Sequence, residues 1–276
     1  EKGKTLGVVG ESGCGKSTLG RVILHLLSAT NGEIFLAERD ISNPDKHELH
    51  RLRRDMQMVF QDPFSSLNPR MSVSEIIGEP LRIYKTYNSK SEYREKVIEL
   101  METVGLPERY ENTYPHELDG GRRQRIGIGR ALALNPRFIV CDEPVSALDV
   151  SIQAQILNLM MDLQDKRQLT YLFITHDLSV VKHISDDIMV MYLGVMVEKC
   201  SSERLFKSQL HPYTKALLSA IPRPKLDANN NRIILRGEIT SPIAPPNACR
   251  FSARCNYSCE ICNKEAPMLE EVIPNH

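Results

Sequence analysis

Four stretches of the chain are apolar almost throughout, at residues 5–10, 56–60, 137–144 and 169–177. A short continuous apolar run predicts a strand that is buried on both faces. These runs alternate with stretches of helical character, and the alternation favours a parallel sheet covered by helices on both sides. We therefore expect an α/β fold.

The intervening stretches predict helices at residues 16–27, 91–105, 121–136 and 151–164, with a Pro- and Ser-rich loop at 61–70. Two of these helices carry apolar residues at helical spacing, which indicates one buried face in each. The expected buried positions are Tyr93, Val97, Leu100, Met101 and Val104 in one helix, and Ile152, Ile156, Leu159, Met160 and Leu163 in the other. Gly105 is a suitable helix stop.

The composition of the 276 residues is that of an ordinary globular protein, with 41% hydrophobic and 25% charged residues and a net charge of zero. This balance does not indicate binding to nucleic acid or to an anionic membrane. The longest apolar run, residues 188–197, is about half as long as the roughly 20 residues of a membrane-spanning helix. The chain starts with neither a signal peptide nor Met, so we expect a fragment of a cytoplasmic protein that meets a membrane only through partners.

Residues 10–17 read GESGCGKS and lie between a predicted strand and a predicted helix. This is the phosphate-loop pattern, in which glycines let backbone N–H groups face phosphate oxygens and the helix N-terminus adds a favourable dipole. Lys16 would reach the β- and γ-phosphates, and the Ser17 hydroxyl would ligate Mg²⁺. The alternative is a glycine-rich turn without a ligand, but the full motif in this context favours ATP and Mg²⁺.

The predicted strand at 137–144 ends on two acidic residues, Asp142 and Glu143. A carboxylate at such a strand end suits Mg²⁺, directly or through water, and a second carboxylate can polarise an attacking water. Alone, the pair could be an acidic strand end without a catalytic role. Because a phosphate loop is present, we expect Asp142 at the metal and Glu143 at the water.

Six motifs in one order resemble those of the ATP-binding subunits of ABC transporters, across roughly residues 1–200. GESGCGKST resembles the Walker A motif, Gln61 in VFQDP the Q-loop, and LDGGRRQR the signature motif. FIVCDEP resembles Walker B, SALD the D-loop, and His176 in FITHD the switch histidine. The resemblance implies a P-loop NTPase fold with a RecA-like core and a helical subdomain, and an ATP hydrolase activity.

Further stretches resemble the oligopeptide and dipeptide importer branch of this family, which also includes nickel-type importers. The sequence of residues 60–81 is typical of that branch, and LHPYTKALLSAIP at 210–222 and the later CRFSARC resemble its C-terminal extension. The resemblance implies an ABC domain over residues 1–222, with a helical subdomain at about 62–135, and a linker with a cysteine-rich extension over 223–276. The first strand of the domain and the aromatic residue that stacks on adenine would precede residue 1.

The resemblance also assigns roles within one subunit. It implies Glu143 as the catalytic base, Gln61 at the metal and the attacking water, and His176 at the γ-phosphate. Mg²⁺ would be held by Ser17, Gln61 and Asp142. The residues implied in ATP binding are Gly10, Glu11, Ser12, Gly13, Cys14, Gly15, Lys16, Ser17 and Thr18.

Two subunits of this family sandwich two ATP molecules, so the resemblance implies partners. They are a second ABC ATPase, expected to be a paralogue, two transmembrane permease subunits and, indirectly, an extracellular or periplasmic peptide-binding protein. We therefore expect a bacterial protein that is peripheral at the cytoplasmic face of the cell membrane. The signature residues Leu118, Asp119, Gly120, Gly121 and Arg122 would contact the partner's ATP, and the D-loop residues Ser146, Ala147, Leu148 and Asp149 the partner subunit.

The signature departs from the Ser-Gly-Gly-Gln of the family, because Asp119 and Arg122 replace Ser and Gln. Asp is as good a helix N-cap as Ser, so the start of the helix is expected to be kept. An ionised Asp cannot donate a hydrogen bond to a phosphate, and it repels one. Arg122 lies three residues on and is expected to neutralise Asp119. We expect this signature to dock on the partner's ATP, but less effectively than one with Ser.

Four of the seven cysteines, Cys249, Cys255, Cys259 and Cys262, crowd into one short segment. An intracellular setting argues against disulfides, and neighbouring thiols suit a soft metal. Zinc sites more often place two close pairs on separate knuckles, whereas iron–sulfur loops crowd their cysteines in one run. The importer branch is linked with an iron–sulfur cluster in this tail, so a [4Fe–4S] cluster is the first expectation, with zinc and unliganded thiols left open.

Two other functions compete with a transport ATPase. A soluble ABC ATPase of translation, repair or cluster assembly often carries two ATP-binding halves in one chain, whereas this chain has one. A zinc module that binds nucleic acid would use stacking side chains, and the tail offers only Phe251 and Tyr257. We therefore expect an importer ATPase without a nucleic-acid partner.

Overall fold

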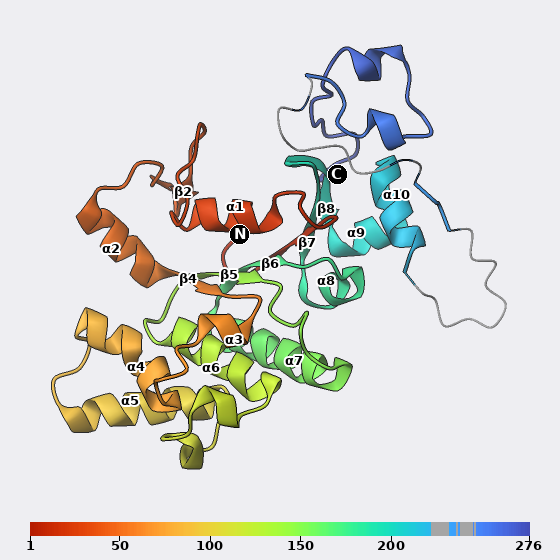
Figure 1. Cartoon of the computed structure of the whole chain (residues 1–276). Helices are drawn as coiled ribbons and strands as arrows, with labels where there is room; N and C mark the ends of the chain where they lie inside the picture. The colour runs from red at the N-terminus through yellow and green to blue at the C-terminus, as the bar shows by residue number, and fades with distance from the viewer. Residues whose placement is uncertain (222–231, 236, 238–244, 246) are drawn as a thin grey trace. The chain divides into compact units, whose positions relative to one another are not determined.

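A computed structural model of the chain describes residues 1–221, 232–235, 237, 245 and 247–276 (Figure 1). The chain divides into two compact units, the first made of Glu1–Lys4 and Thr18–Leu172 and the second of Thr5–Ser17 and Phe173–His276. The predicted linker from residue 223 onward lies largely outside the described residues. Across the described ranges, no helix combines the length and the apolar character that crossing a lipid bilayer requires.

The first unit contains a parallel pair of strands and most of the helices. Strand β4 (Met56–Val59) runs parallel to β5 (Phe138–Asp142), with Met56 opposite Phe138. Such pairing, between strands joined by helices, is what the alternating pattern predicts. The other elements are α1 (Lys16–Ile23), β2 (Phe35–Leu36), β3 (Arg39–Asp40), α2 (Lys46–Asp55), α3 (Pro63–Ser66), α4 (Val73–Tyr84), α5 (Lys90–Thr103), η1 (Glu108–Tyr110), η2 (Pro115–Glu117), α6 (Gly120–Leu132), α7 (Val150–Arg167) and β6 (Thr170–Ile174), with the division between units passing through α1 and β6.

Helices α4, α5 and α6 pack against one another in the first unit (Figure 1). Ile77, Met101 and Ile126 are fully buried, one from each helix. Of the five apolar positions predicted on α5 and at its C-cap Val104, four are buried, and Tyr93 is half-buried. Gly105 adopts a positive φ of 70° directly after the helix, as a stop residue should.

Helix α7 confirms the predicted core face only in part. Ile156, Met160 and Leu163 are buried, whereas Ile152 and Leu159 are half-buried. Leu157, which the sequence pattern did not include, is also buried. A helix that packs on several neighbours buries a wider stripe than one regular repeat predicts.

Several predicted boundaries are wrong, and the helix predicted at 121–136 ends at Leu132. The helix predicted at 16–27 ends at Ile23, because His25 adopts a left-handed φ of 54°. The predicted loop after β4 contains one turn of helix, α3, with Pro63 in its first turn. Asp62 caps this turn by accepting from the Phe64 N–H at 2.8 Å. Pro and Asp suit a helix start as well as they suit a loop.

In the second unit, β1 (Thr5–Val9) runs parallel to β7 (Asp187–Tyr192), which pairs antiparallel with β8 (Val195–Ser201). The longest apolar run of the sequence is therefore a hairpin rather than one element. Leu193 and Gly194 form its turn with φ of 43° and 80°. The helices of this unit are α8 (Leu178–Ile184), α9 (Ser202–Lys207), α10 (Pro212–Ser219), η3 (Ser252–Arg254) and η4 (Glu260–Asn263).

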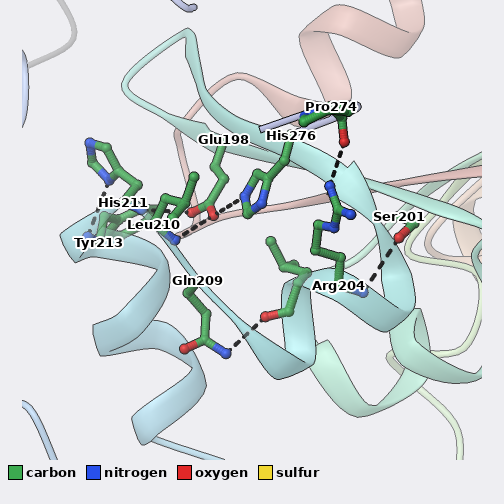
Figure 2. Close-up of polar contacts among 10 residues, drawn as sticks. Glu198, Ser201, Arg204, Gln209, Leu210, His211, Tyr213, Pro274 and His276 are labelled. Carbon is green, nitrogen blue, oxygen red and sulfur yellow. Dashed lines mark hydrogen bonds and ion pairs between the residues drawn. The ribbon is translucent and has the colours of Figure 1, made fainter. Parts of the chain in front are cut away.

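A buried carboxylate connects β8 to two later segments of the second unit (Figure 2). Glu198 accepts from the N–H groups of Leu210 and His211 at 2.8 and 3.0 Å. Its Oε1 also lies 2.6 Å from Nε2 of His276. Because Glu198 and His276 are both almost fully buried, this cluster fixes residue 276 against the strand.

Candidate functional site

The phosphate loop of the second unit follows β1 and has the backbone that its glycines allow. Gly10, Gly13 and Gly15 have φ of 156°, 79° and 101°. A Cβ on Gly10 would lie 2.2 Å from the carbonyl oxygen of Met191, so no other residue fits there. The Gly194 N–H donates to the Cys14 carbonyl at 2.8 Å and ties the loop to the β7–β8 turn. The glycines thus give the loop a backbone conformation that other residues rarely adopt.

Lys16 is 5% exposed, and its ammonium group contacts the loop itself. Nζ donates to the carbonyl oxygens of Gly10 and Glu11 at 2.8 and 3.0 Å. Nearby, burial raises the pKa of the Cys14 thiol, so this cysteine stays neutral and contributes its backbone rather than a thiolate. The Lys16 ammonium group thus lies against two carbonyl oxygens of its own loop.

His176 and Ser17 also belong to the second unit, at the end of β6 and the start of α1. The Thr175 N–H before the histidine donates to the Val8 carbonyl at 3.1 Å. Asp177 after it caps α8 by accepting from Ser179 at 2.8 Å. His176 is therefore an exposed side chain between two fixed backbone positions.

In the first unit, the structure brings the predicted Gln61 and Glu143 together. Gln61 Nε2 donates to Glu143 Oε2 at 3.0 Å, across 82 residues of sequence. Glu143 has a left-handed φ of 46°, a conformation that costs a non-glycine residue energy and concentrates at functional sites. Asp142, at the end of β5, is 2% exposed.

The D-loop continues from this acidic strand end. The Ser146 hydroxyl donates to the Glu143 carbonyl oxygen at 3.0 Å, and the Gln153 amide donates to the Leu148 carbonyl at 3.0 Å. Ala147 and Asp149 are exposed. Of the predicted Mg²⁺ ligands, Gln61 and Asp142 belong to the first unit and Ser17 to the second.

The signature stretch begins α6, with Asp119 as N-cap. The Asp119 carboxylate accepts from the Arg122 N–H at 2.8 Å and also pairs with the Arg122 guanidinium, which confirms both sequence predictions. A Cβ added to Gly120 would lie 3.1 Å from the Leu148 side chain, and one added to Gly121 would lie 2.6 Å from the Ile152 side chain. The glycines therefore permit close packing of the signature on the D-loop and α7.

The cysteine-rich tail brings two of its four thiols together. The Sγ atoms of Cys259 and Cys262 are 3.5 Å apart, and hydrogen bonds from the backbone and thiol of Cys259 lower the pKa of Cys262. The Cys249 N–H donates to the Cys262 carbonyl at 2.9 Å, so both ends of the cysteine run meet. Among the described residues, no group of three or more His, Cys, Asp or Glu side chains is placed to hold a metal.

Two residues next to the phosphate loop were not predicted from the sequence. The Tyr213 hydroxyl accepts from the Glu11 N–H at 2.8 Å, and the Arg254 guanidinium pairs with the Glu11 carboxylate. Both lie in stretches that the sequence showed only as features of the C-terminal extension. Nothing in those stretches indicates a contact with a loop about 200 residues earlier.

Comparison with known proteins identifies two family models on this chain. A model described as ABC transporter matches residues 1–146. A model described as Oligopeptide/dipeptide transporter, C-terminal region, matches residues 197–262. The two matches follow each other in sequence without overlap.

Curated relatives match along the whole chain. It is 52% identical over 279 residues to the oligopeptide transport ATP-binding protein AppF of Bacillus subtilis, covering 100% of this chain and 84% of the relative. It is also 52% identical to the dipeptide transport ATP-binding protein DppF of Haemophilus influenzae (98% and 83% covered) and to the oligopeptide transport ATP-binding protein OppF of Escherichia coli (98% and 81% covered).

The fold is also found among solved structures. A post-hydrolysis dimer of the ATP-binding cassette MJ0796 bound to ADP and Pi is similar, with a TM-score of 0.66 and 32% sequence identity, over 73% of this chain and 87% of the other. A second structure, of cbiO1 from Clostridium perfringens, has a TM-score of 0.69 at 25% identity, over 76% and 81% of the two chains. The α/β P-loop fold predicted from the motifs is thus confirmed.

Proposed function

The chain belongs to the ABC transporter family of ATP-binding proteins, and on that premise we propose that it hydrolyses ATP to power the import of oligopeptides or dipeptides. One observation carries this proposal: the ABC match and the oligopeptide/dipeptide C-terminal match occur on the same chain. Relatives named for oligopeptide or dipeptide transport cover it almost completely. These names favour peptide cargo over nickel, and a transport ATPase over a soluble ABC ATPase.

For the chemistry, we assign the proton transfer to Glu143. Its carboxylate accepts a proton from water as the water oxygen attacks the γ-phosphorus, and the bond between that phosphorus and the β,γ-bridging oxygen breaks to release ADP. Gln61 holds Glu143 through the 3.0 Å hydrogen bond and orients the water. His176 contacts the γ-phosphate. The ordered motifs and the Gln61–Glu143 contact support these roles.

ATP is bound by residues 10–18, with the loop amides on the phosphates and Lys16 on the β- and γ-phosphates. Ser17, Gln61 and Asp142 are the proposed holders of Mg²⁺, since hydroxyl, amide and carboxylate oxygens are the ligands this ion prefers. When bound, Mg²⁺ neutralises charge that develops on the phosphate oxygens. The glycine conformations and the buried Lys16 support this assignment.

The signature and the D-loop are proposed to face a second ABC subunit, with Asp149 bridging to it. The exposed α6 start, where Asp119 and Arg122 are both about half exposed, supports a contact with a separate chain. We further propose two permease subunits as membrane partners, a binding protein that delivers peptide, and a place at the cytoplasmic face of the membrane.

The function is tested by isolating the transporter from native membranes through a tag on this chain. We expect two polytopic membrane proteins and a second ABC ATPase in the complex, and ATP hydrolysis that short peptides with their binding protein stimulate but Ni²⁺ does not. Glu143→Gln is expected to lower kcat by about 10²–10⁴-fold without loss of the complex. A complex without membrane proteins, or one stimulated by Ni²⁺ alone, contradicts the proposal.

We also propose that the cysteine-rich tail binds an iron–sulfur cluster. The 3.5 Å Cys259–Cys262 thiol pair and the meeting of Cys249 with Cys262 support it, while the four thiols do not form a closed site in this structure. Anaerobic purification should give iron and acid-labile sulfide in equal amounts, and both should be lost on Cys259→Ser with Cys262→Ser. Zinc in their place, or no metal, overturns the cluster.

A further inference from the structure

The cysteine-rich tail makes an ion pair with the phosphate loop inside the second unit. Arg254 Nη1 and Nη2 lie 2.7 and 3.1 Å from the two carboxylate oxygens of Glu11. The pair is bidentate, and the Arg254 side chain is 8% exposed and the Glu11 side chain 25% exposed. Such a pair is stronger and more directional than a surface contact.

Glu11 is held at every polar group it carries. Its N–H donates to the Tyr213 hydroxyl at 2.8 Å, its carbonyl accepts from Lys16 at 3.0 Å, and its carboxylate pairs with Arg254. Two of these three contacts come from the C-terminal part of the chain. The conformation of the loop at Glu11 thus depends on residues far from the phosphate motif.

The tail is anchored well enough to hold Arg254 in place. Phe251 is 2% exposed and packs on Tyr192 and Tyr213, with ring centroids 5.1 and 5.5 Å away. The Arg250 guanidinium donates to the Leu193 carbonyl, in the turn that also contacts the loop. Aromatic packing of this kind fixes orientation as well as burying area.

The charge of Glu11 explains why the loop needs this partner. Glu11 is the only acidic residue among the eight of the phosphate loop, GESGCGKS. An unpaired carboxylate there would repel the phosphates of ATP. Arg254 cancels that charge, and the same contact keeps the carboxylate directed toward the tail, which is consistent with the raised pKa of Arg254 beside Glu11.

We propose that Arg254 is a positioning residue for ATP binding, which neutralises Glu11 and fixes the phosphate loop from the cysteine-rich tail. The inference rests on the proposed function, because it concerns the ATP site of this same chain. It places the effect in ATP affinity rather than in the chemical step. In this proposal Arg254 acts through Glu11.

The test uses the transporter isolated through this chain. It measures the azido-ATP concentration that gives half-maximal photolabelling of this subunit, and separately KM and kcat for ATP hydrolysis. Arg254→Gln is expected to raise the half-maximal concentration about threefold to tenfold, as loss of a partly buried pair would, with kcat within about twofold. Arg254→Lys, which keeps the charge but not the bidentate geometry, should show a smaller rise.

A charge mechanism and a merely structural one differ in a double-mutant cycle. In a Glu11→Gln background, Arg254→Gln should change the half-maximal concentration by less than about twofold, because no carboxylate is left to neutralise. An effect as large as in the unmodified chain overturns the proposal. So does an Arg254→Gln variant that labels like the unmodified subunit.

Lys264→Gln is the matched control, since it removes a positive charge from the same tail at a side chain that is 71% exposed. It should leave the half-maximal concentration unchanged, and an equal rise there contradicts a specific role of Arg254. If Arg254→Gln does not fold, Arg254→Met preserves the packing volume and should show the same rise. An unmodified complex that does not hydrolyse ATP would instead contradict the proposed function. Photolabelling is measured separately, so the two failures can be told apart.

Discussion

At the scale of single residues, the molecule keeps its proposed chemistry on strained or tightly held side chains. Glu143 adopts a left-handed backbone conformation that few non-glycine residues adopt, and Gln61 fixes its carboxylate. A base that is held before substrate arrives needs no reorganisation during the reaction. The sequence predicted roles for both residues, but only the fold shows them in contact.

Asp119 gives the first prediction at this scale. Its carboxylate caps α6 and pairs with Arg122, so it contributes to folding while it presents a negative charge where the family has Ser. Asp119→Ser keeps a cap and restores a hydrogen-bond donor. ATP hydrolysis by the assembled transporter at saturating ATP should rise about twofold to tenfold, the size of one recovered hydrogen bond.

Asp119→Asn separates the two effects, because Asn keeps the cap and removes the charge. It should give part of the rise seen with Ser. Hydrolysis that is unchanged or lower in Asp119→Ser would mean that the carboxylate was never a handicap to docking on the partner's ATP.

At the scale of elements, the helix caps connect local sequence to tertiary contacts. His211 is the N-cap of α10, and its Nδ1 accepts from the Tyr213 N–H at 3.2 Å. The backbone N–H of His211 donates to the Glu198 carboxylate (Figure 2). The cap requires a neutral ring, because a protonated Nδ1 cannot accept. Burial lowers the pKa of His211 below its usual 6.5, and the charge of Glu198 opposes this only in part.

A pH dependence of stability follows from this cap. The folded chain binds the His211 proton less readily than the unfolded chain, so protonation favours unfolding and stability is lost as pH falls below about 6.5. His211→Asn keeps a capping side chain that does not titrate. Between pH 7.5 and 5.5, the unmodified chain should lose more free energy of unfolding in urea than this variant. Equal losses would contradict the assigned cap.

At the scale of the whole molecule, ligand binding should appear as stability. Anything that binds only the folded chain raises the free energy of unfolding, by about 2.7 kcal/mol at one hundred times Kd. MgATP should therefore raise the thermal midpoint of the unmodified chain. Lys16→Ala, which removes the ammonium group at the centre of the loop, should abolish most of the shift in the same scan. A shift of equal size in both would contradict the proposed phosphate site.

Short-range sequence patterns predicted several strands and helices and the residues of the local motifs. Continuous apolar runs predicted β1, β4, β5 and β6, because a buried strand must be apolar on both faces. The phosphate loop, the acidic strand end and the Asp119 cap were equally local, since glycine conformations and caps are set within a few residues. The predicted boundaries failed where a single residue, such as His25, left the helical conformation.

Contacts between distant stretches of the chain are visible in the folded structure but not in the sequence pattern. It turned the apolar run at 188–197 into a hairpin, brought Gln61 to Glu143, and set Tyr213 and Arg254 against Glu11. Periodicity reports which face of an element is buried, but not which element covers it. The partner of a side chain two hundred residues away is fixed by packing, and packing has no local signature in the sequence.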